Sequence, residues 1–342
     1  MRSAYVYEKG KVAVKEVSLP EIKEDDVLVK VAFCGLCGSD IHVFHDNHAF
    51  KTIPYYLGHE LSGIVERVGD KVTKVKVGDH VTVDPHKYCR KCYHCQNGME
   101  NLCENLVLLG QGEWYGGAGE YVVAKEDVIY CLDRNVPLRR GTLVEPLSIA
   151  MTNLSRSNPD MRETIAILGC GPIGLMGVVA AKAYGFKTIL CTDPIQNNLD
   201  VARKIGATHT FNPMNTNVAE EILKVTGNTG VDFTLLTAES SKVMQDAIRI
   251  TRSHGHICYI VVSQNRLEID FGDFVGRELI LVGSNGCREE MFEKACALIN
   301  KGVDLDAVFT KEFPLSKMQE AMEFLDSKSP DNPVIKVLVY PD

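Results

Sequence analysis

The sequence predicts an α/β protein with two parts, a β-rich part and a doubly wound parallel sheet. The first 145 residues contain short alternating apolar runs separated by Gly, Pro and acidic turns, which is typical of β-strands. From about residue 150 to residue 287, apolar strands alternate with helical stretches, which is typical of a parallel sheet with helices on its faces. The length of 342 residues agrees with about two domains.

The individual elements follow from local pattern. In the β-rich part, alternation predicts strands at residues 5–7, 11–17, 27–33, 63–68 and 80–83. In the second part, apolar runs predict strands at residues 165–168, 188–191, 231–236 and 256–262. Helices near residues 289–300 and 315–325 and a last strand at 334–340 need not belong to the parallel sheet.

A glycine-rich turn follows the strand at residues 165–168 and leads into a helix. The turn reads Gly169-Cys170-Gly171-Pro172-Ile173-Gly174. Glycines at these spacings let the backbone turn sharply and approach a pyrophosphate, and the helix N-terminus offers free N–H groups to the anion. Asp193 ends the next strand, close to where a carboxylate should accept the adenosine ribose hydroxyls. The stretch therefore predicts half of a dinucleotide site.

Other interpretations of this stretch are weaker. Residues 165–181 carry no charge, but Pro172 and four glycines interrupt the run, which disfavours one membrane-spanning helix. An ordinary buried strand and helix would not explain the acidic residue at the right distance. Because that carboxylate repels a 2′-phosphate, and residues 194–198 include no Arg or Lys to bind one, we expect NAD rather than NADP.

The composition disfavours several classes of partner. Hydrophobic residues make up 45% and charged residues 24% of the chain, as in an ordinary globular protein. The net charge of −8, without a basic block, argues against nucleic acid and anionic membranes as partners. The N-terminus has no apolar signal core, so we expect a cytoplasmic protein, in which twelve cysteines indicate thiolate or metal chemistry rather than disulfides.

Four closely spaced cysteines lie in the β-rich part, at Cys89, Cys92, Cys95 and Cys103. Four thiolates on one loop can close a tetrahedron, and a site with four protein ligands and no open position is structural. Zinc suits such a site best because it tolerates all-thiolate tetrahedral coordination without redox activity. Disulfides and an iron–sulfur cluster are the alternatives.

A second group of candidate ligands is more dispersed, at Cys37, His59, Glu60 and Glu145. Each residue alone has an ordinary explanation as a buried cysteine or a surface polar residue. Together they supply one thiolate, one imidazole and two carboxylates, which is enough for three protein ligands and an exchangeable water.

These motifs together resemble those of the medium-chain zinc-dependent alcohol dehydrogenases. The resemblance rests on Cys37-Gly38-Ser39-Asp40, His59-Glu60-Leu61-Ser62-Gly63, the four-cysteine loop, Val144-Glu145-Pro146 and the glycine turn. They occur in the family's order over essentially the whole chain, and the branch they resemble most is that of the polyol and threonine dehydrogenases. The resemblance implies a GroES-like catalytic domain of residues 1–149 and 288–342 and a Rossmann NAD-binding domain of residues 150–287.

The resemblance also implies roles for individual residues. Cys37 and His59 would be direct ligands of a catalytic zinc. Glu60 and Glu145 would share the remaining task, one binding the ion while the other holds its water. With the four-cysteine loop, this makes two zinc ions per chain, one catalytic and one structural, beside NAD.

Two further residues match the family's path for the alcohol proton. Ser39 matches the hydroxyl that contacts the substrate oxygen, and His42 matches the histidine that passes the proton to solvent. The alternative for His42 is a solvated turn residue, because His45 and His48 show that this loop is rich in histidine.

The implied reaction is oxidation of a secondary alcohol of a polyol, sugar acid or similar small metabolite, with hydride transfer to NAD. An L-threonine or 2,3-butanediol dehydrogenase has the same motifs, and a non-catalytic NAD-binding zinc sensor is the alternative from another class. Sorbitol-type members carry an Arg-Tyr pair that is absent from residues 283–287. By family analogy we expect a homodimer or homotetramer, with the strand at residues 279–282 as a candidate for pairing between subunits.

Overall fold

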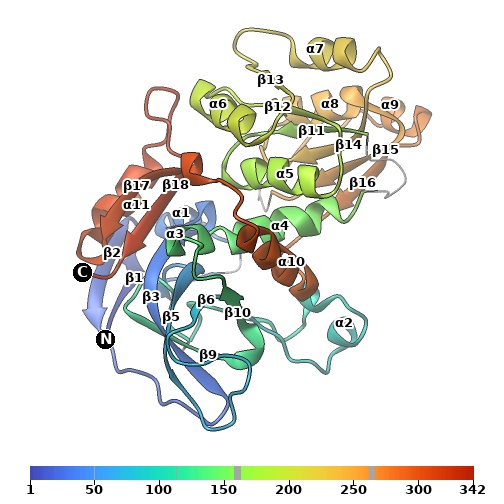
Figure 1. The fold of residues 1–342 in the computed structure, drawn as a ribbon. Coiled ribbons are helices and arrows are strands. Elements are labelled where there is room, and N and C mark those ends of the chain that lie inside the picture. The colour runs from blue at the N-terminus through green and yellow to red at the C-terminus, as the bar shows by residue number, and fades with distance from the viewer. Residues whose placement is uncertain (50, 113, 158–162, 262–265) are drawn as a thin grey trace. The chain divides into compact units, whose positions relative to one another are not determined.

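The computed structural model describes residues 1–49, 51–112, 114–157, 163–261 and 266–342 (Figure 1). The chain divides into two compact units. The first unit comprises Met1–Ser148, Cys287–Lys328 and Lys336–Asp342, and the second comprises Ile149–Gly286 and Ser329–Ile335. Within the described part of the chain, every helix is too short or too polar to cross a bilayer.

The first unit is built mainly from β-strands. Its strands are β1 (Arg2–Glu8), β2 (Lys11–Glu16), β3 (Asp26–Leu36), β4 (Tyr55–Tyr56), β5 (Glu60–Val68), β6 (His80–Val83), β7 (His86–Lys87), β8 (Val107–Leu108), β9 (Tyr121–Lys125), β10 (Ile129–Leu132), β17 (Phe309–Pro314) and β18 (Lys336–Tyr340). Its helices are α1 (Gly38–Phe44), α2 (Tyr93–Gln96), α3 (Leu138–Gly141), α10 (Glu289–Asn300) and α11 (Met318–Asp326), with α4 (Val144–Leu154) starting in it.

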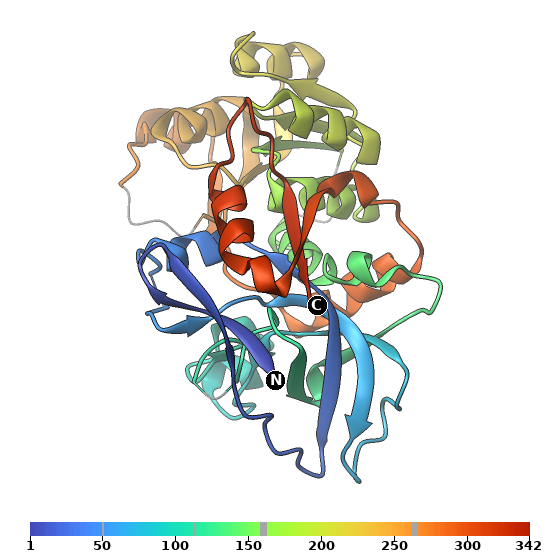
Figure 2. The same ribbon diagram turned by 90° about the vertical axis from the view of Figure 1, so that its left-hand side faces the viewer.

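The largest sheet of this unit has the order β10-β6-β5-β3-β18-β17, with β9 also paired to β3. Smaller sheets have the orders β2-β1-β4 and β7-β8. Strand β18 lies between β3 and β17, so the last strand of the chain completes a sheet that begins with strands of the N-terminal segment, and Figure 2 shows the termini close together. An ion pair of 3.5 Å between Arg2 and Asp342 also joins them.

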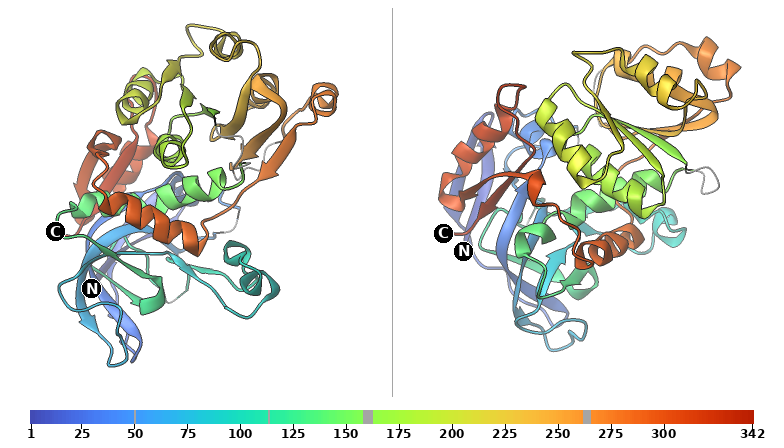
Figure 3. Two further views of the ribbon diagram at one scale, coloured as in Figure 1. Left: turned by 45° about the vertical axis from the view of Figure 1, so that its right-hand side comes forward. Right: turned by 45° about the horizontal axis from the view of Figure 1, so that its top comes forward.

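The second unit is a parallel sheet covered by helices. Its strands are β11 (Thr164–Leu168), β12 (Thr188–Thr192), β13 (His209–Phe211), β14 (Val231–Leu236), β15 (Thr251–Tyr259) and β16 (Ile280–Gly283), in the order β13-β12-β11-β14-β15-β16. Its helices are α5 (Pro172–Ala183), α6 (Gln196–Ile205), α7 (Val218–Val225), α8 (Ser241–Ile250) and α9 (Phe271–Gly276). Figure 3 shows α5 and α6 on one face of the sheet and α8 and α9 on the other, as right-handed crossovers require. Because both faces are covered, the central strands consist mostly of buried apolar residues.

The predicted α/β fold class is confirmed, and several elements match their predicted ranges. Strands β6 and β14 and helix α10 have the predicted bounds. The strand predicted at residues 256–262 was placed too late, because β15 already begins at Thr251, directly after α8. The polar residues before Gly255 resemble a turn, and His254 does adopt a positive φ within the strand. Val262 lies outside the described residues.

Two smaller corrections concern the end of the chain. The helix predicted at residues 315–325 begins as a 3-10 turn, and α11 itself starts at Met318. The strand predicted at residues 334–340 starts at Lys336, where pairing with β17 begins. The prediction that this strand need not belong to the parallel sheet is correct, since β18 pairs with β3 and β17 in the first unit.

The β core of the first unit can be tested with two valines. Val81 on β6 is fully buried, whereas Val77 in the preceding turn is 60% exposed. We expect Val81→Ala to lower the free energy of unfolding by about 2 kcal/mol, because it removes buried methyl groups and leaves a cavity. We expect Val77→Ala to change it by less than about 0.5 kcal/mol. Urea denaturation of both variants measures the difference, and equal losses would contradict the packing described for β6.

Candidate functional site

Three of the predicted zinc ligands converge at the ends of two neighbouring strands. Cys37 follows β3 and caps helix α1, His59 directly precedes β5, and Glu60 begins β5. Because β3 and β5 are antiparallel and Gly35 pairs with Glu60, the three side chains meet. Their ligand atoms all lie within 4.8 Å of one another. A thiolate, an imidazole and a carboxylate in this arrangement match the donor set of a zinc ion.

Lys336 forms a fully buried ion pair with Glu60. Its Nζ donates to both carboxylate oxygens of Glu60, at 2.8 and 2.6 Å, and to the carbonyl oxygen of Leu36 at 3.1 Å. Neither side chain has any solvent exposure. A Cβ at Gly35 would overlap Oε2 of Glu60, so the backbone of β3 approaches the carboxylate as closely as only glycine allows. Glu60 is therefore held firmly from two sides.

Asp40 holds the other two residues of the cluster. Its Oδ2 accepts a hydrogen bond of 2.9 Å from the backbone N–H of Cys37. Its Oδ1 lies 3.7 Å from Nδ1 of His59, and neither of these two buried atoms has a hydrogen-bond partner among the described residues. A histidine that binds a metal through one ring nitrogen usually directs the other toward a carboxylate. The pair of Asp40 and His59 thus fits a metal-binding role for His59.

Glu145 lies outside the close set of ligand atoms but interacts with it electrostatically. It is buried in the first turn of α4. Burial, with Glu60 and Cys37 as neighbouring acidic groups, raises the pKa of Glu145 to about 8, although His59 acts in the opposite direction. Burial and Glu60 likewise raise the pKa of the Cys37 thiol. These acidic groups thus repel one another, and a divalent cation would stabilise their ionised forms.

Ser39 and His42 both lie on helix α1, directly after Cys37. Ser39 is partly buried and His42 is exposed. Nδ1 of His42 lies 3.2 Å from Oδ1 of Asn47, a hydrogen bond that orients the ring. The helix therefore has a hydroxyl near the cluster and an imidazole at the solvent.

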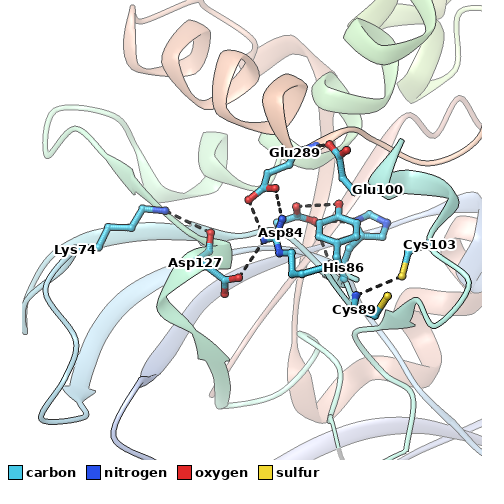
Figure 4. Close-up of polar contacts among 10 residues, drawn as sticks. Lys74, Asp84, His86, Cys89, Glu100, Cys103, Asp127 and Glu289 are labelled. Atoms are coloured by element: carbon cyan, nitrogen blue, oxygen red, sulfur yellow. Dashed lines mark hydrogen bonds and ion pairs between the residues drawn. The ribbon is translucent and has the colours of Figure 1, made fainter. Parts of the chain in front are cut away.

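The four cysteines of the loop gather as predicted. The sulfur atoms of Cys89, Cys92, Cys95 and Cys103 lie within 4.8 Å of one another. The backbone N–H of Cys89 donates to Sγ of Cys103 at 3.3 Å, as Figure 4 shows. Hydrogen bonding from the backbone of Lys91 lowers the pKa of Cys89 to about 6, which favours the thiolate that binds a metal. Their close grouping fits a tetrahedral zinc.

The loop is tied to α10 by further polar contacts. Arg90 pairs with Glu289 at 2.5 Å and with Asp127 at 3.0 Å. Glu100 accepts a hydrogen bond of 2.9 Å from the backbone N–H of Glu289, at the start of the helix (Figure 4). The position of the loop therefore depends on a helix from the C-terminal part of the chain.

In the second unit, the glycine turn and Asp193 meet at one edge of the sheet. Leu168 and Thr192, the last residues of β11 and β12, lie side by side, so Gly169 and Asp193 follow at adjacent strand ends. Asp193 accepts backbone hydrogen bonds of 2.8 Å from Cys170 and from Ile195. This is the crevice at the carboxyl ends of parallel strands where dinucleotides bind.

The other residues of the turn form the start of α5. Gly171 is the N-cap, Pro172 and Ile173 are the first helical residues, and Gly174 is buried. A Cβ at Gly174 would overlap the carbonyl oxygen of Gly169, so only glycine allows this close packing of helix on strand. The turn and the helix N-terminus are thus shaped to receive a pyrophosphate.

Sequence reasoning missed two residues that contact Cys37, His59 and Glu60 (together the Cys37 cluster). Asp40 stands within the quoted motif Cys37-Gly38-Ser39-Asp40, but the motif alone does not reveal that its carboxylate faces His59. Lys336 was detectable as the one cation in the apolar run from Val334 to Val339, where only a buried partner explains a lysine. Its partner, 276 residues away, was not predictable from local pattern.

Two family models match the chain. The one described as an alcohol dehydrogenase GroES-like domain matches residues 23–134, and the one described as a zinc-binding dehydrogenase matches residues 172–301. Sorbitol dehydrogenase of Bacillus subtilis (strain 168) is 32% identical over 348 residues, covering 100% of this chain and 98% of that protein.

Solved structures of dehydrogenases also resemble this chain over nearly its whole length. The structure of 2R,3R-butanediol dehydrogenase from Bacillus subtilis has a TM-score of 0.90 and 29% identity, and covers 100% of this chain and 99% of its own. A protein described as a zinc-binding dehydrogenase, from Sinorhizobium meliloti 1021 and bound to NADP, also has a TM-score of 0.90 and 29% identity, with 99% of both chains covered. The predicted family resemblance and the GroES-like and Rossmann folds are confirmed.

The buried pair of Lys336 and Glu60 has a direct test. We expect Lys336→Met to lower the free energy of unfolding by about 3–5 kcal/mol, because it leaves a buried carboxylate without a counter-charge. The double variant with Glu60→Gln should be more stable than Lys336→Met alone. Lys71→Met, which breaks the exposed pair of Lys71 and Glu24, is the control and should leave the stability unchanged. Urea denaturation measures all three, and a stable Lys336→Met protein would show that the pair is not needed.

Proposed function

We propose a function from the premise that this chain belongs to the zinc-dependent medium-chain alcohol dehydrogenases: it oxidises a secondary alcohol of a polyol, sugar acid or similar hydroxylated metabolite to a ketone, reversibly and with NAD. The observation that carries the proposal is the meeting of Cys37, His59 and Glu60, with the acidic Glu145 nearby. A binding protein needs no zinc site with an open position, whereas a dehydrogenase does.

We propose that Cys37 and His59 bind the catalytic zinc and that Glu60 and Glu145 share its remaining position. The ionised Cys37, Glu60 and Glu145 would supply three negative charges, and Lys336 supplies one positive charge beside Glu60. A divalent cation balances the remaining two. Because Lys336 already engages both oxygens of Glu60, Glu145 is the carboxylate with more freedom to approach the ion.

The dinucleotide would be held by the second unit. We propose that the backbone N–H groups of Gly171, Ile173 and Gly174 face the pyrophosphate. Pro172 has no N–H to donate, and Gly169 provides the sharp turn. Asp193 would accept the ribose hydroxyls, for which its two backbone hydrogen bonds hold it in place. The structural neighbour bound to NADP makes the preference for NAD a point to be measured.

The chain's own residues would position the alcohol and remove its proton. A zinc held by Cys37 and His59 would supply Lewis acidity at the substrate hydroxyl, and NAD held at the glycine turn would supply the hydride acceptor. Ser39, partly buried after Cys37, would contact the substrate oxygen and relay its proton, accepting it as the serine's own hydroxyl proton leaves. His42, exposed and oriented by Asn47, would release it to solvent.

The four-cysteine loop would hold a structural zinc. Its four sulfur ligands complete a tetrahedron and leave no position for a substrate. Its ties to α10 through Arg90 and Glu100 suggest that this zinc stabilises a surface rather than taking part in the chemistry.

The substrate class rests on the relatives. Sorbitol dehydrogenase matches the whole chain at 32% identity, which favours a polyol or a sugar derivative. A butanediol or threonine dehydrogenase is the second candidate, favoured by the structural likeness to butanediol dehydrogenase at 29% identity. Its smaller substrates would need a narrower pocket.

Assembly and location are further proposals. Strand β16 is the outer strand of the parallel sheet, and Leu281 on it and Phe271 and Val275 on α9 are 41%, 63% and 69% exposed. We propose that this edge pairs with a second copy in a homodimer or homotetramer. All twelve cysteines are free thiols, which supports a cytoplasmic location.

The function is tested by NADH formation with a panel of polyols, sugar acids, diols and threonine, combined with zinc analysis. We expect turnover with polyols or sugar acids. Cys37→Ala should lose one zinc equivalent and nearly all turnover, whereas Cys131→Ala, which changes an exposed cysteine outside the clusters, should lose neither. Full zinc content without turnover on any substrate would favour the sensor, and a fully active Cys37→Ala protein would reject the site.

The coenzyme preference is tested at Asp193. We expect Asp193→Asn to lower kcat/KM for NAD by roughly tenfold or more, because a hydrogen bond to a charged group is worth about 1.5–3 kcal/mol. The ratio of NAD to NADP efficiency should fall as the repulsion of the 2′-phosphate is removed. Asp200→Asn makes the same charge change at an exposed position of α6 and should alter neither value. A wild-type preference for NADP would contradict the assignment.

A further inference from the structure

A third set of potential metal ligands lies in the first unit, apart from both zinc clusters. It consists of Asp84 and His86, just after β6, and Cys287, which lies 201 residues beyond His86. Nδ1 of His86 is 2.6 Å from Oδ1 of Asp84 and 3.6 Å from Sγ of Cys287. All three ligand atoms lie within 4.8 Å of one another, and all three residues are buried. The set shares no residue with the other two clusters.

The protons available to these groups satisfy only one of the two contacts of Nδ1 at a time. Nδ1 of a histidine either bears one proton or offers one lone pair. If Nδ1 bears the proton, it donates a hydrogen bond to Asp84, and the thiol of Cys287 cannot donate to it. If it offers the lone pair, Cys287 can donate, but a carboxylate oxygen then faces that lone pair at 2.6 Å. A cation between the three atoms would accept a lone pair from each of them.

The carboxylate of Asp84 is already oriented for such a role. Its Oδ1 also accepts from the backbone N–H of His86 at 3.2 Å, and its Oδ2 accepts from the hydroxyl of Tyr88 at 3.2 Å. The ring of Tyr88 stacks on that of His86 with an angle of 11° between the planes. Figure 4 shows Asp84 and His86 beside the loop of Cys89 and Cys103. Such outer contacts are what hold metal ligands in place.

We propose that Asp84, His86 and Cys287 form a third metal site, which takes a borderline-soft divalent cation of the zinc class. One sulfur, one nitrogen and one oxygen donor suit zinc, and a thiolate with a carboxylate would neutralise its two charges. Zinc bonds of about 2.3 Å to sulfur and about 2.0 Å to nitrogen and oxygen at a tetrahedral angle place sulfur and nitrogen about 3.5 Å apart and nitrogen and oxygen about 3.3 Å apart. The distance between Sγ and Nδ1 is 3.6 Å, whereas Nδ1 and Oδ1 of Asp84 lie 2.6 Å apart, so the Asp84 carboxylate would move outward to bind the ion. Binding would release the protons of the thiol and of Nδ1 to solvent.

This site would join the two main segments of the first unit. Asp84 and His86 belong to the N-terminal segment, and Cys287 is the first residue of the segment that resumes this unit before α10. A metal shared by both segments would therefore stabilise the point where the chain returns. The proposal is independent of the proposed function, because no residue of the site has a part in the reaction.

The test is metal analysis of the purified full-length protein after zinc loading. We expect three zinc equivalents per chain in the wild type and two in His86→Gln and in Cys287→Ala. Cys296→Ala changes another buried cysteine, on α10 and outside all three clusters, and should keep three. Unchanged zinc content in both His86→Gln and Cys287→Ala would overturn the proposal, whether or not the enzyme oxidises polyols.

A second measurement needs no change in Asp84, His86 or Cys287 and so does not depend on whether variants at these residues fold. In cadmium-substituted wild-type protein, cadmium NMR should give three resonances, one from an all-sulfur site and two from sites with mixed ligands. Addition of substrate or NAD should not be needed to see any of them. If only one mixed-ligand resonance appears and Cys37→Ala removes it, the third site is overturned. If only one appears and it persists in Cys37→Ala, the result counts against the proposed active site alone.

Discussion

The ion pair of Lys336 and Glu60 is the contact on which the arrangement of Cys37, His59 and Glu60 depends. Both side chains are fully buried, so each is tolerated only in the presence of the other. Lys336 begins the last strand of the chain, and Glu60 begins β5, next to His59. The cluster can therefore take its shape only when β18 has joined β3. In this way the final residues of the chain control a site whose ligands lie near its beginning.

Concentrated acidic and thiol groups are a common feature of the first unit. The Cys37 cluster, the four-cysteine loop and the Asp84 cluster each gather groups that would repel one another or compete for protons when ionised. A divalent cation would resolve that conflict in each case. All three clusters lie at strand ends or in the loops that follow, so the sheets hold them rigidly. The second unit, by contrast, provides glycine backbone, a helix N-terminus and a single carboxylate for a dinucleotide.

Local pattern was sufficient for elements whose apolar period is regular and uninterrupted. The strands β6 and β14 and the helix α10 were predicted with their bounds because burial of one face or of both imposes a clear repeat. Strand β15 was misplaced because polar residues and Gly255 interrupt that repeat at its start. The four-cysteine loop was predictable for a related reason, since its ligands lie so close in sequence that almost any compact loop brings them together.

The sequence by itself determined the α/β fold class, the family, the dinucleotide turn and the residue types available for metal binding. These properties depend on short-range spacing and on the order of motifs, which chain folding does not alter. Only the tertiary structure decided that Glu60 is paired with Lys336, that Asp40 faces His59, and that Cys287 meets His86. Partners separated by hundreds of residues are chosen by strand pairing and burial, because an unpaired charge is costly only once the sheets have excluded water around it.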